Sequence, residues 1–336
     1  IAEIGAPDTG TVCPSTSWTS GDYTLDQNGI ARQFRVRLPT GYNSDQAYPL
    51  IALFHGWGGD GSEFLDNVTV QSQSDERGYV LVAPLGLGRE EPGNRLSSWS
   101  FQGSTTGLDG DGLNAAVSGD TNAICDDDRT PNYTYPSCGG IAENGCSWTQ
   151  CSVDDVAFSV ALVQEVSANV CTDSDRVYAV GGSNGGMFVW DLGRDERSAE
   201  VFRAIAPILG LPHRGYLDPP VSEGGMPVIS ITGSRDRTVP PGEWGQDTFT
   251  TTSDGDVYYY SSASAITKVW AEAHSCDTTV PAEPVDIGGS SMECRGWSYC
   301  QSDSQWPPVL DCRGDMGHMY NLNSSWPLIL DFFEQL

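Results

Sequence analysis

The sequence predicts an α/β fold, in which helices cover both faces of a mostly parallel sheet. Short, continuous apolar runs typical of buried strands recur along the chain, and stretches with helical periodicity lie between them. Buried strands that alternate with helices form parallel sheets, so this order favours a sheet packed between two helical layers. The expected central strands are 49–54, 79–84, 177–180, 202–209 and 226–233.

The remaining elements can be placed in order along the chain. Residues 31–39 alternate in polarity, as a half-buried strand does. A helix is expected over 154–169, because Asp154 and Asp155 stand at its start and apolar residues recur at helical spacing after them. Further helices are expected directly after the 177–180 strand, over 266–274 and over 326–336.

Two segments do not follow this alternation. Residues 103–151 are rich in Gly, Asp, Ser, Thr and Cys, with almost no apolar periodicity. A stretch of this length in a compact domain is usually functional or held by disulfides, so we expect a disulfide-rich insertion near the functional site. Residues 275–312 form a second Cys-rich irregular segment. Internal repeats and flexible linkers are not evident, so we expect a single domain over 1–336.

Charge limits the partners of the chain. The 336 residues carry 17 basic against 45 acidic side chains, a net charge of −28. Nucleic acids and anionic membrane surfaces need a basic face and are therefore not expected as partners. No run of eighteen apolar residues predicts a membrane span. We expect a monomer.

Cysteines and sequons point to the compartment. Ten cysteines suit five disulfides, and no C-x-x-C pair suggests a metal. Cys276–Cys312 and Cys294–Cys300 are plausible pairs by proximity, although sequence alone leaves connectivity open. Together with a start at Ile1, these features favour a processed, secreted, extracellular glycoprotein. Sequons begin at Asn67, Asn132 and Asn323.

Acidic runs at 109–112 and 125–128 offer the oxygen ligands that calcium prefers, but neither follows a complete calcium-loop pattern. Acidic surface runs are usually just solvated. We therefore expect no metal site.

The most specific pattern is G-x-S-x-G at 181–185. A strand precedes it and helix-forming residues follow, which is the layout of a nucleophile elbow. The sharp turn leaves little room for side chains, so the glycines two before and two after Ser183 relieve a clash. This context indicates that Ser183 is a nucleophile.

A serine nucleophile needs a base, and the chain has four histidines. An acid and then the histidine are expected after the serine, which excludes His55 and His213. His274 falls inside an expected helix, where a packed or solvated histidine is the ordinary interpretation. His318 lies in a glycine-flanked loop after a short apolar run, and is therefore the predicted base.

The predicted acid is Asp236, which directly follows the 226–233 strand. Loops at the carboxyl ends of parallel strands meet at one edge of a sheet, where Ser183 also lies. A turn aspartate is the alternative, and Asp218 and Asp315 are the other candidates for the acid.

Two backbone N–H groups should face the carbonyl oxygen as it gains negative charge. One is expected from Asn184, directly after the nucleophile, and the other from Trp57 in the glycine-rich loop after the 49–54 strand. His55 is expected to brace this loop by hydrogen bonding.

These residues, in this order, resemble the feruloyl esterase, acetylxylan esterase and poly(3-hydroxybutyrate) depolymerase group of α/β-hydrolases. The matching parts are His55-Gly56, 153–158, the elbow, the Asp236 loop and Gly317-His318, and the resemblance covers roughly residues 30–330 without the insertion. It implies the α/β-hydrolase fold and ester hydrolysis through an acyl-enzyme, without a cofactor.

The resemblance also assigns residues. Ser183, Asp236 and His318 carry over as the triad, and Trp57 and Asn184 as oxyanion donors. Trp99 is similar to a tryptophan that these enzymes place near the substrate, and Trp57 and Met319 are further candidates for substrate binding. A departure concerns the Trp-Pro that family members often carry shortly after the histidine, where this chain has Met319-Tyr320. This departure puts in doubt which residues form the wall of the substrate site beside His318, and the family does not supply them.

The expected function is therefore a secreted serine carboxylic ester hydrolase, a feruloyl or acetylxylan esterase acting on plant cell-wall polysaccharide. An extracellular poly(3-hydroxybutyrate) or related polyester depolymerase is the alternative. A narrow aromatic slot would favour ferulate, and exposed aromatics around a shallow site would favour a polyester. A non-catalytic binding protein on the same fold is the alternative of another class, against which the complete triad argues.

Overall fold

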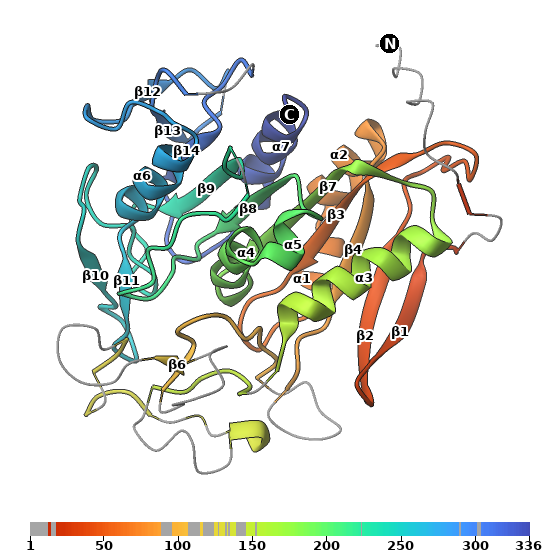
Figure 1. The fold of residues 1–336 in the computed structure, drawn as a ribbon, viewed down its shortest axis with the longest axis horizontal. Coiled ribbons are helices and arrows are strands. Elements are labelled where there is room, and N and C mark those ends of the chain that lie inside the picture. Colours follow the sequence, from red (N-terminus) through yellow and green to blue (C-terminus); the bar gives the residue numbers. More distant parts are fainter. Residues whose placement is uncertain are drawn as a thin grey trace.

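A ten-stranded sheet forms the centre of the protein in a computed structural model (Figure 1), in the order β1-β2-β4-β3-β7-β8-β9-β14-β13-β12. The six strands from β4 to β14 in this order are parallel, and the strands at both edges are antiparallel. The structure describes residues 13–14, 18–88, 96–106, 115–116, 124–126, 128–131, 133, 135–138, 146–151, 153–222, 224–288, 290–300 and 304–336. The strands of this sheet are β1 Gly21–Gln27, β2 Ile30–Arg37, β3 Tyr48–Phe54, β4 Val80–Pro84, β7 Thr172–Gly182, β8 Ala204–Ile208, β9 Val228–Gly233, β12 Glu283–Val285, β13 Glu293–Gly296 and β14 Val309–Gly314.

Two short ribbons and seven α-helices complete the described structure. The ribbons pair β5 with β6 and β10 with β11. Their strands are β5 Thr105–Thr106, β6 Ala115–Ala116, β10 Phe249–Thr251 and β11 Tyr259–Ser261. The helices are α1 Ser62–Leu65, α2 Val68–Arg77, α3 Asp155–Asn169, α4 Asn184–Arg194, α5 Glu196–Ala199, α6 Ala263–Ala273 and α7 Leu322–Phe333, and Pro136–Cys138 form a 3₁₀ turn.

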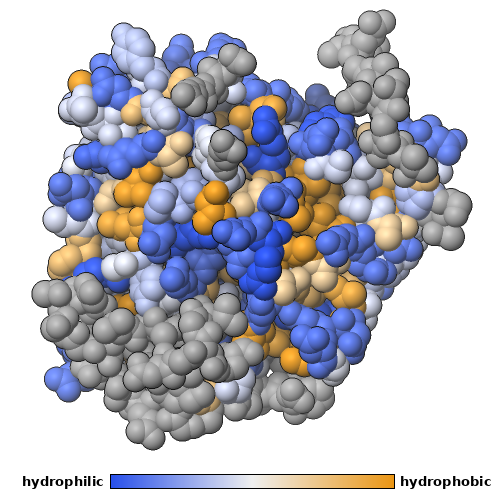
Figure 2. All heavy atoms as spheres, in the orientation of Figure 1, coloured by the Kyte–Doolittle hydropathy of each residue, from blue (hydrophilic) through white to orange (hydrophobic). Residues whose placement is uncertain are grey.

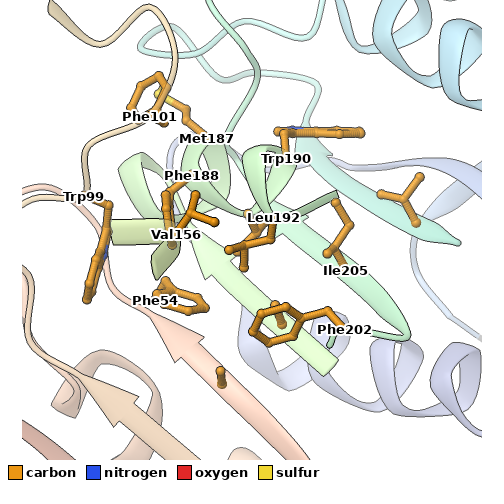
Figure 3. Packing of buried hydrophobic residues seen from close by; sticks show 14 of the residues in the cluster. Phe54, Trp99, Phe101, Val156, Met187, Phe188, Trp190, Leu192, Phe202 and Ile205 are labelled. Carbon is orange, nitrogen blue, oxygen red and sulfur yellow. The ribbon is translucent and has the colours of Figure 1, made fainter. Parts of the chain in front are cut away.

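Alternate residues of the central strands point to opposite faces of the sheet, and each face has its own apolar core. In β3, Leu50 and Phe54 belong to one core and Ile51 and Leu53 to the other. Residues of α3, α4 and α6 fill the first core, and residues of α1, α2 and α7 fill the second. Figure 3 shows part of the first core, where Phe188 and Trp190 of α4 pack over the sheet. The prediction of a mostly parallel sheet covered on both faces is confirmed.

The predicted central strands and helices are present, with ends shifted by a few residues. Asp154 caps the helix that starts at Asp155, because its side chain accepts a hydrogen bond from the Ala157 N–H. The strand predicted at 31–39 is β2, and it pairs with β1, which was not predicted. The segment 275–312, expected to be irregular, contains β12 and β13. In the described part of the chain, no helix is both long enough and apolar enough to cross a bilayer.

Five disulfides use all ten cysteines. Two of them, Cys125–Cys146 and Cys138–Cys151, lie inside the 103–151 insertion, as predicted. The pairs expected in the later segment are wrong, since the structure joins Cys276 to Cys300 and Cys294 to Cys312. The physical reason is strand pairing: β13 and β14 are antiparallel neighbours, and their register sets Cys294 directly opposite Cys312.

The face over α3, α4 and α5 is mixed in character (Figure 2). Hydrophilic and hydrophobic residues alternate there in small patches. Ion pairs contribute to this face, among them Arg197 with Asp154 and with Asp195.

Candidate active site

Ser183 stands at the turn between β7 and α4. Its backbone has φ +50° and ψ −114°, a conformation that residues other than glycine rarely adopt. The Ser183 N–H donates to the Ile208 carbonyl oxygen at 2.8 Å, and the Ser183 carbonyl accepts from the Met187 N–H at 2.8 Å. The neighbouring strand and the first turn of α4 therefore hold the strained residue in place.

The glycines around Ser183 are required by close backbone contacts. A Cβ on Gly181 would lie 2.1 Å from the Gly185 carbonyl oxygen, and a Cβ on Gly185 would lie 2.1 Å from the Phe54 carbonyl oxygen. Both distances are far below van der Waals contact. The predicted clash therefore exists on both sides of Ser183.

The structure brings Ser183, His318 and Asp236 together, although they are far apart in the sequence. His318 Nδ1 lies 2.7 Å from Asp236 Oδ2, and His318 Nε2 lies 2.9 Å from Ser183 Oγ. A carboxylate only accepts hydrogen bonds, so Nδ1 carries the proton and Nε2 accepts from the serine hydroxyl. This arrangement can remove a proton from Ser183.

Asp236 is fixed by its own loop. Its Oδ1 accepts from the N–H groups of Thr238 and Val239, both at 2.9 Å, which leaves Oδ2 for His318. The residue is only 4 % exposed, whereas the His318 side chain is 26 % exposed. Asp236 is therefore buried behind His318, and His318 faces the cavity.

The other candidates for the acid and the base lie elsewhere. Asp315 has a side chain that is 84 % exposed and pairs with Arg235. Asp218 does not line the cavity at Ser183, and its carbonyl oxygen accepts from Trp270 Nε1. His274 ends α6, and burial lowers its pKa. His213 is fully buried, and burial lowers its pKa to about 4.

The two expected oxyanion donors lie on either side of the elbow. Asn184 begins α4 and Trp57 belongs to the loop after β3. Among the hydrogen bonds between described residues, none is donated by the backbone N–H of Trp57 or Asn184. Both groups are therefore available to a ligand at Ser183, and their role as oxyanion donors stays a prediction.

His55 braces the Trp57 loop. The Gly86 N–H donates to His55 Nε2 at 2.9 Å, so Nδ1 carries the proton and donates to the Gly56 carbonyl oxygen at 2.7 Å. Burial lowers the pKa of His55 to about 4, so the ring is neutral at physiological pH. This geometry fits the bracing role expected for His55.

Trp99 does not line the cavity, which corrects the expectation that it contacts the substrate. Its side chain is 0 % exposed and packs on Phe188, and its Nε1–H donates to the His55 carbonyl oxygen at 3.0 Å. Its backbone N–H donates to Asn184 Oδ1 at 2.8 Å. Trp99 therefore holds the two segments that carry the expected oxyanion donors.

A cavity of about 530 Å³ opens above Ser183 and His318. Trp57 and Met319 line it, and Met319 is 65 % exposed; their role in substrate binding stays a prediction. Tyr133 and Trp148 of the insertion form part of the wall, which places described parts of 103–151 at the site. The cavity is also lined by Tyr258, Tyr260, Glu63, Asp254 and Asp256.

Sequence reasoning missed several of these residues. Tyr258 and Tyr260 lie in or next to β11, in a region without recognised periodicity. Glu63 lies in the one-turn helix α1, and Tyr320 follows His318 by two residues. Tyr320 occupies the place where the expected Trp-Pro is missing, and this departure was the available signal.

The described residues include no group of three or more His, Cys, Asp or Glu side chains that could hold a metal ion. The acidic run at 109–112 lies outside the described residues, as does Asp127 of the second run. The sequon residue Asn132 is also outside them. Asn67 is described, and its side chain caps α2 by accepting from Thr69 and Val70.

Comparisons with known proteins agree with this architecture. The chain is 27 % identical over 205 residues to feruloyl esterase D of Neurospora crassa, an alignment that covers 61 % of this chain. It spans about half the length of that relative, 54 %. No model of a known protein family matches the chain.

Among solved structures, acetyl xylan esterase from Aspergillus awamori superposes with a TM-score of 0.50 at 13 % identity. The match covers 94 % of this chain and 100 % of that one, and at this identity it supports the fold. The strand order with a parallel centre, the elbow after β7 and these two likenesses confirm the resemblance drawn from the sequence. The chain has the α/β-hydrolase fold and is similar to feruloyl esterase D and to an acetyl xylan esterase.

Proposed function

We propose that the chain is a secreted serine carboxylic ester hydrolase that acts through an acyl-enzyme. The observation that carries this proposal is the pair of hydrogen bonds that links Ser183 to His318 and His318 to Asp236 at the base of an open cavity. A binding protein on the same fold would have no need of this alignment. The likeness to feruloyl esterase D supports the same chemistry.

The proposed reaction begins when Ser183 Oγ attacks the ester carbonyl carbon and His318 Nε2 takes the hydroxyl proton. Asp236 holds the imidazole in the required tautomer and stabilises the imidazolium that forms. The carbonyl oxygen becomes negative and accepts hydrogen bonds from the N–H groups of Trp57 and Asn184. His318 then gives its proton to the departing alcohol, which leaves an acyl group on Ser183.

The second half of the reaction repeats these steps with water. His318 removes a proton from a water molecule, which attacks the acyl carbon and regenerates the oxyanion. Collapse of this intermediate releases the carboxylic acid, and Ser183 Oγ recovers its proton from His318. Every proton is accounted for, so the cycle requires no metal or redox cofactor.

We further propose an aromatic acyl group, as in feruloylated plant-wall polysaccharide, for the cavity. Six tryptophan and tyrosine side chains line it, the five named below and Tyr320, and aromatic rings pack on each other by stacking or edge contacts. They are buried or half-buried rather than exposed around a shallow surface, and this favours a slot over a polymer-binding plane. The aromatic residues are Trp57, Tyr133, Trp148, Tyr258 and Tyr260.

Secretion is part of the proposal because the five disulfides require an oxidising compartment. The wall polysaccharides named here are also extracellular. An acetylated xylan remains the second substrate, since a small acyl group also fits a cavity of this size.

The experiment has two parts. Purified protein and its Ser183→Ala variant are compared on methyl ferulate, acetylated xylan and a hydroxybutyrate polymer, with Ser72→Ala in α2 as a surface control. We expect ferulate release by the wild type and the control, and none by Ser183→Ala. Hydrolysis that survives Ser183→Ala would show the nucleophile to be wrong. Release from the polymer in place of ferulate would overturn the substrate proposal and leave the chemistry standing.

A further inference from the structure

A carboxylate next to the expected oxyanion donor has no part in the reaction described above. Glu63 belongs to α1, directly after the Trp57 loop, and it lines the cavity at Ser183. Its Oε2 accepts from the Gly56 N–H at 2.9 Å and from the Tyr320 hydroxyl at 2.8 Å. One oxygen atom therefore joins the loop that carries Trp57 to the segment that carries His318.

The loop is shaped to receive this carboxylate. A Cβ on Gly59 would lie 1.8 Å from Glu63 Oε1, so a side chain at position 59 would displace the carboxylate from this place. The Gly59 N–H donates to the Gly56 carbonyl oxygen at 3.0 Å and closes a tight turn around Trp57. On the far side, the Gly58 N–H donates to the Ser97 carbonyl oxygen at 2.7 Å. Trp57 is thus held through both of its neighbours. Gly56 is held at its carbonyl oxygen by His55 and Gly59, and at its N–H by Glu63.

Tyr320 is also closely surrounded by its neighbours. Its ring stacks on Phe64, with centroids 5.4 Å apart and an interplanar angle of 17°. A Cβ on Gly182 would lie 2.1 Å from Tyr320 Cζ, and a Cβ on Gly56 would lie 2.5 Å from its hydroxyl oxygen. Burial, with the nearby charge of Glu63, raises the pKa of this hydroxyl well above its ordinary value. The hydroxyl therefore stays protonated and donates to Glu63.

We infer that Glu63 is a positioning residue for the proposed esterase reaction, and that with the Tyr320 hydroxyl it sets the direction of the Trp57 N–H toward the developing oxyanion. This inference rests on the proposed function. Hydrogen bonds to a charged acceptor are stronger than neutral ones, so the carboxylate restrains Gly56 more firmly than a water molecule would. An error of about 1 Å in such a donor can reduce the rate about 100-fold.

Three variants test the inference in the intact protein: Glu63→Ala, Glu63→Gln and Tyr320→Phe. Asp66→Asn is the matched control, because Asp66 is an exposed carboxylate at the end of the same helix. Steady-state kinetics on an ester that the wild type hydrolyses give kcat and KM separately. The affinity for a boronic acid, which forms a tetrahedral adduct with a serine nucleophile, reports on the oxyanion donors directly.

We expect Glu63→Ala to lower kcat by about 10- to 100-fold, with KM changed by less than about threefold, because the interaction is made with the transition state. Boronate affinity should fall by a similar factor. Glu63→Gln should recover most of the loss, since an amide oxygen still accepts from the Gly56 N–H. Tyr320→Phe should lose about three- to tenfold in kcat, and Asp66→Asn should match the wild type.

Several outcomes would overturn the inference. These are a Glu63→Ala variant with kcat within twofold of the wild type, a loss confined to KM, and a Glu63→Gln variant as impaired as Glu63→Ala. If Glu63→Ala does not fold, Glu63→Gln and Tyr320→Phe decide by the same criteria. If Ser183→Ala is inactive while the Glu63 variants keep wild-type activity, only this inference is refuted. An active Ser183→Ala variant refutes the proposed function as well.

Discussion

Replacing Asp236 by asparagine should almost abolish ester hydrolysis, although the two side chains have nearly the same shape. The orientation of the new amide is dictated by the loop. Two backbone N–H groups, from Thr238 and Val239, point at Oδ1 from 2.9 Å, so the amide oxygen must take that place. The amide NH₂ then faces His318 Nδ1 at the position where Oδ2 accepts at 2.7 Å.

The consequence is a change of tautomer. An NH₂ group is a donor, so His318 Nδ1 must become the acceptor and the ring proton must move to Nε2. Nε2 then faces Ser183 Oγ at 2.9 Å as a donor and cannot accept the serine proton. Loss of the correct tautomer in a serine triad lowers kcat by about 10⁴, equivalent to about 5 kcal/mol of transition-state stabilisation. We expect a loss of about 10³- to 10⁴-fold in kcat/KM.

The assay is ester hydrolysis followed at neutral pH for Asp236→Asn, Asp236→Ala and Asp315→Asn. Asp315→Asn is the control, because its exposed side chain pairs only with Arg235 among the described residues. The control should match the wild type, and thermal unfolding should show that all three variants fold. A kcat/KM for Asp236→Asn within tenfold of the wild type would refute the tautomer reasoning and reopen the choice of the acid.

Three further predictions concern stability and substrate choice. Gly185→Ala should prevent folding or lower Tm sharply, because its Cβ would lie 2.1 Å from the Phe54 carbonyl oxygen. The control Gly21→Ala should fold normally, since its Cβ would have only Tyr23 near it, at 3.9 Å. Thermal melts of both variants by circular dichroism test this, and equal Tm values would contradict it. The pKa of His55 and of His213 is lowered to about 4 by burial, so the unfolded chain binds more protons than the folded one below pH 6.5. Each histidine should contribute a stability that is present above pH 6.5 and lost as the pH falls toward 4, about 2 kcal/mol by pH 5. Urea unfolding should show the free energy of unfolding falling over this pH range, and His213→Phe should make the fall smaller. An unchanged fall in His213→Phe would contradict the buried, neutral state of His213. Asp254 and Asp256 line the cavity, and its lining includes no lysine or arginine among the described residues. An ester with a carboxylate near the scissile bond should therefore be hydrolysed about two- to fivefold more slowly than its neutral analogue. Asp254→Asn or added salt should narrow this difference, and an equal rate for both esters in the wild type would count against it.

The three predicted residues that the structure brings together, Ser183, Asp236 and His318, have local signatures in the sequence. The elbow needs glycine at 181 and 185 for reasons of backbone contact, and such requirements are visible as a pattern in the sequence. Asp236 and His318 were found because they follow strands whose carboxyl ends meet at one edge of the sheet. Their distances to Ser183 agree with that expectation, while their catalytic roles await the variants described above.

The errors share a different cause, which is dependence on partners distant in the sequence. Trp99 stands in a loop, where a tryptophan is expected to be accessible, but Asn184 and His55 bind its backbone and its ring nitrogen and bury it. The Cys294–Cys312 pair depends on the register of β13 against β14, which no short pattern encodes. Glu63 and Tyr320 are 257 residues apart and become neighbours only when α1 meets the His318 loop.

The expected oxyanion donors are oriented by bonds that the protein makes with its own groups. On one side, Glu63 and the Ser97 carbonyl oxygen hold the two neighbours of Trp57. On the other, the Asn184 side chain exchanges hydrogen bonds with the Trp99 backbone and is fixed by them, and the Asn184 N–H donates to no partner among the described residues. Donors that are aimed before the reaction cost no reorganisation when charge develops. The proposed chemistry therefore depends on the sheet and its adjoining turns, and we expect differences in substrate to follow instead from the wall formed by Tyr133, Trp148 and Tyr258.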